Sequence, residues 1–187
     1  MTRDEALDLV KDWTKNPNLI KHMLAVEAEM RGLAKHFAED EELWGLAGLL
    51  HDADYEMFKD DPKRHPSKIF EELEKRQVDP RIIAAIRAHA WGWKEDCPEP
   101  ASKMDWALYT CDDLSGFIIA CVLVRPDKKL SSLTVENLQK KWPEKSFAAG
   151  AKRDHTILCE EKLGLPLKEY MQLCLTALQV VAPSLGL

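Results

Sequence analysis

The sequence has no apolar run that approaches the roughly 20 consecutive residues needed to span a membrane as a helix. Its beginning, MTRDEALDLV, is acidic and lacks the apolar centre of a secretory signal peptide. We therefore expect no membrane association and a cytoplasmic location.

Cysteine pairs at metal-binding or redox spacing are also missing. The cysteines are odd in number and scattered, without a CxxC pair, which excludes a zinc finger and argues against a disulfide framework. All but the first lie in apolar helical context, where they are expected to be small buried hydrophobic residues. The five are Cys97, Cys111, Cys121, Cys159 and Cys174.

Positive charge is not in excess, because the formal net charge is −6. A field of this sign does not favour binding to an extended nucleic acid. A small anionic substrate would need a local positive site, such as a metal ion.

No alternating, β-branched segment bounded by turns predicts a strand, and apolar residues recur at helical spacing nearly everywhere. There is no repeat, low-complexity segment or linker. With 45% apolar and 31% charged residues, the composition is that of a soluble globular protein. We predict an all-α protein, a single compact helical domain over 1–187.

Capping residues and prolines set the expected helix boundaries. Proline-containing loops are predicted at 55–66 and 91–102. The helices are predicted over 2–13, 17–37, 40–52, 66–76, 80–90, 102–124, 134–142, 146–162 and 166–181.

The six histidines are not all alike. His22 lies on the apolar face of its predicted helix, and the pair His51 and Asp52 ends an apolar helix, GLAGLLHD. His36, at a helix C-terminus, and His155, in a polar turn, are expected on the surface.

Further polar residues interrupt apolar faces downstream. His89 follows Ile82 and Ile86 on the inward face of its helix, and His65 lies in a proline-flanked loop. Asp112 stands in an apolar helix, where an ionised carboxylate is costly unless it is paired or bound to metal. His22 alone is more typical of a hydrogen-bonded core histidine, but a shared metal cluster would satisfy all of these groups together.

This ordered pattern resembles the HD-domain superfamily of metal-dependent phosphohydrolases, which is named for its adjacent His-Asp pair. The resemblance covers about residues 17–125 and carries the expectation of an HD-type bundle of about seven to nine helices. The segment FAAGAKRDHTILCEEKLGLPLKEY is similar to the C-terminal part of a small bacterial branch of predicted HD hydrolases. We therefore expect the helices of 126–187 to pack on the metal-site core.

The resemblance implies a ligand set for two divalent ions, which would be Mn, Fe, Co, Ni, Mg or Zn. It also implies hydrolysis of a phosphate ester, of a nucleotide or another small phosphorylated metabolite, by a metal-activated water. His22, His51, Asp52 and Asp112 are expected around one metal, and His65 and His89 on the second, with Asp52 bridging.

The chain departs from the commonest family pattern directly after the His-Asp pair. It has Ala53, Asp54 and Tyr55 where many members have Ile-Gly followed by a basic residue. Asp54 is a candidate catalytic group beside His51 and Asp52, either for proton transfer or to orient a ligand, and an exposed loop acid is the alternative. Asp113 is the alternative to Asp112 as the final ligand.

Candidate substrate contacts flank the ligand segments. Basic side chains there are candidates for phosphate binding, and two tryptophans after His89 are candidates for stacking on a base or sugar. The alternatives are solvated surface charges and tryptophans that anchor the core or the loop. These candidates are Lys63, Arg64, Arg87, Lys103, Trp91 and Trp93.

Two other functions fit the same ligand pattern. A minority of HD-fold proteins hold two irons and oxidise a substrate with dioxygen, and a domain of this kind can also bind metal or nucleotide without catalysis. Phosphohydrolase activity remains the leading hypothesis of the three.

Overall fold

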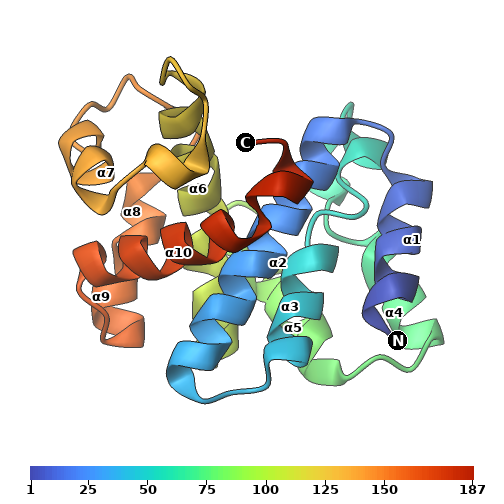
Figure 1. Ribbon diagram of the computed structural model, residues 1–187. Helices are drawn as coiled ribbons and strands as arrows, with labels where there is room; N and C mark the ends of the chain where they lie inside the picture. Colours follow the sequence, from blue (N-terminus) through green and yellow to red (C-terminus); the bar gives the residue numbers. More distant parts are fainter.

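Helix α2 (Pro17–Phe37) runs through the middle of the computed structural model, which describes residues 1–187 (Figure 1). It packs against α3 (Glu41–Leu50), α10 (Leu167–Leu185) and α6 (Lys103–Leu123). These four helices form the centre of the structure, and the functional residues described below lie at their ends and along their shared faces.

Shorter helices surround this centre, and the chain contains no strand, so the predicted all-α class is confirmed. Helices α7, α8 and α9 lie at one end of the molecule and α1 and α4 at the other (Figure 1). Only Ile157 separates α8 from α9. The shorter elements are α1 (Arg3–Trp13), α4 (Lys68–Lys75), α5 (Pro80–Ala88), α7 (Val135–Lys141), α8 (Arg153–Thr156), α9 (Leu158–Leu163) and the 3-10 turns Glu56–Phe58, Pro62–Arg64 and Leu130–Ser132.

The helices begin where capping chemistry predicts. The side chain of Thr2 accepts a hydrogen bond from the backbone N–H of Glu5, and Glu5 reciprocates at the start of α1. Asn16 caps α2 with a proline in the first turn, and Ser102 starts α6 in the same reciprocal way as Thr2.

The helix predicted over 146–162 is wrong in its first half, because α8 begins only at Arg153. The Arg153 guanidinium donates to the backbone carbonyls of Ala148 (3.0 Å), Ala151 (2.9 Å) and Phe147 (2.6 Å). These bonds hold the segment as a series of turns, in which the Ala148 carbonyl also accepts a hydrogen bond from the backbone N–H of Ala151 (3.0 Å). Ala148 also adopts a left-handed conformation, with φ of 47°.

Helix α6 is the one helix long and apolar enough to cross a membrane by length and composition, but 67% of that window is buried inside the protein. It is therefore a core helix. All five cysteines are buried and unpaired. Burial was predicted for all of them except Cys97.

A close approach of α3 to α2 fixes the position of the C-terminal end of α3. A Cβ atom at Gly48 would lie 2.8 Å from the backbone oxygen of Val26, a distance that no real side chain tolerates. Glycine at this position lets the two helices touch through their backbones. His22 and His51 lie one helical turn from this contact, on α2 and at the end of α3 respectively, so the contact brings their side chains together.

The core also contains an unpartnered acid. The side chain of Glu29 in α2 is fully buried, and neither of its carboxylate oxygens has a hydrogen-bond partner. Burial, followed by the negative charge of Asp112, raises the pKa of this carboxyl group well above its ordinary value of 4.5. The folded protein therefore keeps the proton of Glu29 at pH values where the unfolded chain has lost it.

Because of Glu29, the free energy of unfolding of the protein should consequently fall as the pH rises. Between the unfolded and folded pKa values the folded state binds more protons, so each increase in pH favours unfolding. Glu29→Gln, which is neutral at every pH, should exceed the wild type in free energy of unfolding by a margin that grows from about pH 5 to pH 8. Urea unfolding across this range measures it, and a margin independent of pH would contradict the assignment.

Glu27 provides the matched control for this experiment. It is nearly as buried, but its carboxylate pairs with Arg3 (2.6 Å) and Arg31 (3.1 Å). Glu27→Gln breaks two ion pairs, so it should lower the free energy of unfolding where Glu29→Gln raises it.

Candidate metal centre

Six polar side chains from five segments of the chain gather at one place between α2, α3, α5 and α6. They form two groups in which potential ligand atoms lie within 4.8 Å of one another. The first group is His22, His51 and Asp112, and the second is Asp52, His65 and His89.

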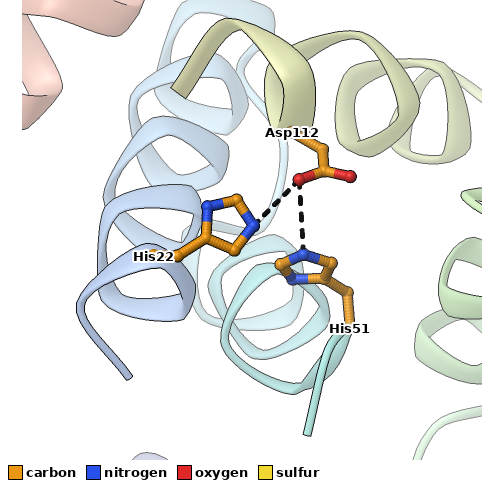
Figure 2. A group of neighbouring side chains, drawn as sticks. All are labelled: His22, His51 and Asp112. Atoms are coloured by element: carbon orange, nitrogen blue, oxygen red, sulfur yellow. Dashed lines mark ion pairs between the residues drawn. The ribbon is translucent and has the colours of Figure 1, made fainter. Parts of the chain in front are cut away.

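The first group meets at one carboxylate oxygen (Figure 2). Oδ1 of Asp112 lies 2.9 Å from Nε2 of His22 and 3.5 Å from Nε2 of His51. The three residues come from α2, the end of α3 and the middle of α6, so three separate elements must pack correctly to bring these atoms together.

The second group is centred on Asp52, the residue that follows His51. Oδ1 of Asp52 lies 3.0 Å from Nε2 of His65 and 3.7 Å from Nε2 of His89. His65 follows the short turn Pro62–Arg64, and His89 caps the C-terminus of α5.

Asp52 also faces the first group with its other oxygen. Oδ2 lies 3.6 Å from Nε2 of His22 and 3.5 Å from Nε2 of His51. One carboxylate therefore turns one oxygen toward His22 and His51 and the other toward His65 and His89.

Hydrogen bonds at Nδ1 fix the orientation of three of the four imidazole rings. Nδ1 of His51 donates to the carbonyl of Gly48 at 2.7 Å, and Nδ1 of His89 donates to the carbonyl of Ile86. Nδ1 of His65 bonds to Asp54 at 2.6 Å. Each of these bonds leaves Nε2 as the nitrogen that faces the cluster, the form in which neutral histidine binds metals.

Asp54 lies behind His65. It is fully buried, and its second oxygen accepts hydrogen bonds from the backbone N–H groups of Ser67 (2.9 Å) and Ile69 (3.0 Å). These contacts occupy the carboxylate, so the structure favours an orienting role for Asp54 and disfavours both proton transfer to substrate and the exposed loop acid.

The chemistry of the donor set fits divalent metal ions. Nε2 of His51 is buried without a hydrogen-bond partner, although it is aimed at two carboxylates. Burial lowers the pKa of His51, but Asp52 and then Asp112 outweigh it and raise that pKa to about 9. The pKa of Asp52 is held well below its ordinary value, by His51 above all, against the opposing effect of burial. A buried cluster of this kind calls for positive charge, which protons or metal ions can supply.

The cluster is most exposed at His22 and Asp112. The side chains of His51, His65 and His89 are almost completely buried, whereas His22 is 23% and Asp112 is 30% exposed. A substrate can therefore approach along the faces of α2 and α6 that carry His22 and Asp112.

The predicted substrate contacts are mostly engaged elsewhere. The guanidinium groups of two arginines lie 4.5 Å above phenylalanine rings, and a lysine lies 5.1 Å above another. These pairs are Arg64 on Phe58, Arg87 on Phe70 and Lys103 on Phe37, while Lys63 is exposed.

The two tryptophans have different surroundings. Trp91 packs against Trp106 and Tyr109, with ring centroids 5.9 and 5.5 Å apart, which is the anchoring alternative. Trp93 is exposed and stacks on His65, with centroids 5.8 Å apart and planes 14° from parallel. Of the six predicted contacts, only Trp93 touches the cluster in the structure.

Asp113, the alternative to Asp112, points away from both groups. Its oxygens accept from the backbone N–H of Lys152 (2.9 Å) and from Nδ1 of His155 (2.9 Å). His155 also stacks on Tyr109 and keeps 20% of its side chain exposed, so it lies at the surface but is held by its neighbours, whereas His36 is exposed as predicted.

Sequence reasoning missed residues that border the cluster. Tyr55 contacts the edge of His65, with centroids 5.3 Å apart, and Lys21 and Gly116 line grooves beside His22. An isolated glycine inside a helical pattern was the available signal for Gly116.

The comparison with protein families decides the relationship. The family model described as "HD domain" matches residues 19–120, which is more than half of the chain. The chain belongs to the HD-domain family. This HD domain contains all six clustered residues, and the family is a metal-dependent, hydrolase-type superfamily whose members bind divalent metals. No curated protein and no solved structure gave a significant match.

Metal binding to the HD domain should depend on Asp54 even though it lies outside both groups. Asp54→Asn keeps the shape of the side chain but weakens the bond that orients His65, so metal affinity should fall by about 10–100-fold. Competition with a chromophoric chelator measures this affinity. Asp113→Asn is the matched control, and equal losses in both variants would contradict the orienting role.

Proposed function

We propose that this HD-domain protein hydrolyses a phosphate ester of a small phosphorylated metabolite, nucleotides included, with two bound divalent metal ions. The observation that carries the proposal is the position of Asp52, whose two oxygens face separate pairs of imidazoles. Membership of a metal-dependent, hydrolase-type superfamily supports it.

Each residue has a defined part in this proposal. Two divalent ions would supply a water of lowered pKa and neutralise the phosphoryl oxygens. His22, His51 and Asp112 would hold one ion, His65 and His89 the other, and Asp52 both.

The buried side of the cluster holds the reacting groups in place. Hydrogen bonds from Nδ1 fix the rings of His51, His65 and His89, so the Nε2 atoms need little reorganisation when the site is loaded. Burial of these rings keeps bulk water out, and the phosphate would enter from the exposed side of His22 and Asp112.

The charge of the protein supports the same proposal. The net charge is −6, and three of the four basic residues predicted to bind phosphate lie on aromatic rings instead. Metal ions would therefore supply most of the attraction for an anionic substrate. The cysteines are all buried, so none of them is available as a nucleophile, which favours attack by water.

The direct test is hydrolysis of a panel of phosphate monoesters, phosphodiesters and nucleotides by protein supplied with Mn²⁺, Co²⁺, Ni²⁺ or Mg²⁺. Turnover should be lost with a chelator and in Asp52→Ala, because that change removes the shared ligand. Asp127→Asn, at an exposed residue of the loop after α6, should retain full activity.

Metal-loaded protein that hydrolyses nothing in this panel would contradict the proposal. Oxygen consumption by protein that carries two irons, without hydrolysis, would assign it to the oxidative branch of the fold. Nucleotide binding without turnover would assign it a regulatory role.

A further inference from the structure

Two grooves meet at the open side of the cluster, and both are lined by His22 and Gly116. One has a volume of about 400 Å³ and lies between α6 and the turns that precede α8. We call it the loop groove. The other, of about 360 Å³, lies between α2, α6 and the end of α10, and we call it the apolar groove.

Gly116 stands at the junction of the grooves without a structural reason to be glycine. It lies in the interior of α6, one helical turn after Asp112, and has no left-handed conformation. A Cβ atom there would meet nothing within 4 Å. Glycine in a helix interior is less stable than alanine, and here neither packing nor backbone geometry compensates. What glycine does provide is open space beside His22.

The loop groove does not suit further negative charge. Its charged lining consists of Asp112 and Asp113, and its other wall is built from small residues of the turns before α8. Arg153 and Asp113 hold these turns by hydrogen bonds to their backbone. A second or third phosphate placed here would face carboxylates and find no cation.

The apolar groove offers the opposite environment. Leucine and isoleucine side chains form its walls, and one of them, Leu123, is 51% exposed in the absence of any covering group. Lys21 is its single cation, with Asn18 nearby. Its volume lies in the range of small-molecule sites. The apolar walls are Ile119, Leu123, Leu185 and Leu187.

We propose that the apolar groove binds the organic part of a substrate that carries one phosphate group on an apolar alcohol, with Gly116 as a specificity-determining residue. This inference rests on the proposed phosphohydrolase function. The phosphate lies at the metal cluster, the apolar part passes over Gly116, and the walls of the groove exclude water from it.

The test fills the gap at Gly116. In Gly116→Leu, kcat/KM for 1-naphthyl phosphate should fall by about tenfold or more, because the leucine side chain would occupy space that the naphthyl group needs. For methyl phosphate, which does not reach the groove, kcat/KM should change by less than about threefold. In the wild type, 1-naphthyl phosphate should be a better substrate than ADP.

Gly116→Ala should raise Tm by about 2–4 °C, since the helix gains a Cβ that meets no neighbour.

Ala84→Leu is the matched control. It enlarges an exposed helical side chain on α5 that lines a groove of about 440 Å³ without any of the six clustered residues. Its activity on both esters should equal that of the wild type. Metal content of all variants is measured in parallel, and Gly116→Leu should keep the wild-type value.

The outcomes separate this inference from the proposed function. Wild-type protein inactive on every ester contradicts the function itself. An active wild type with equal losses on both esters in Gly116→Leu, no loss on either, or loss of metal, overturns the role of the groove. Calorimetric binding of 1-naphthylmethylphosphonate and methylphosphonate gives a readout without turnover: only the former should bind more weakly to Gly116→Leu.

Discussion

The shared carboxylate of Asp52 is the constraint on which the rest of the site depends. Its two oxygens can face two pairs of imidazoles only if the end of α3 points between α2, α5 and the loop that carries His65. The backbone contact at Gly48 sets this direction, because any side chain there would push α3 away from α2. A contact between two helix backbones thus determines where the Asp52 carboxylate lies.

The same arrangement explains how a largely apolar core contains so much charge. Buried imidazoles and carboxylates stabilise one another, as the raised pKa of His51 and lowered pKa of Asp52 show. Glu29, a short distance behind Asp112, has no such partner and is instead kept neutral by burial. The core therefore holds ionised groups where oppositely charged partners lie beside them, and it keeps the unpartnered Glu29 neutral.

Much of this arrangement was predictable from the sequence. Caps such as Thr2 and Ser102 predict helix starts, and the polar residues His22, His89 and Asp112 stand out because they interrupt apolar faces. Roles that depend on contacts distant in sequence were not predictable. Arg153, for example, donates hydrogen bonds to carbonyls of earlier turns that lie where a helix was predicted.

The surroundings of individual charged side chains were equally unpredictable from the sequence. Arg87 and Lys103 flank ligand segments in the sequence, yet their side chains lie on aromatic rings. The sequence allows Asp54 to be an exposed loop acid, but backbone N–H groups at the start of α4 donate hydrogen bonds to its carboxylate. The match to the family ends at residue 120, so the turns before α8, which wall the loop groove, lie outside the matched segment.

In the proposed function, the two groups of side chains joined by Asp52 form a site for two metal ions. Metal analysis of protein purified without added metal, followed by titration with Mn²⁺, is the decisive measurement. Two ions per chain are expected at saturation. A chain that binds no ion, or that binds two equally well after Asp52→Ala, would contradict it.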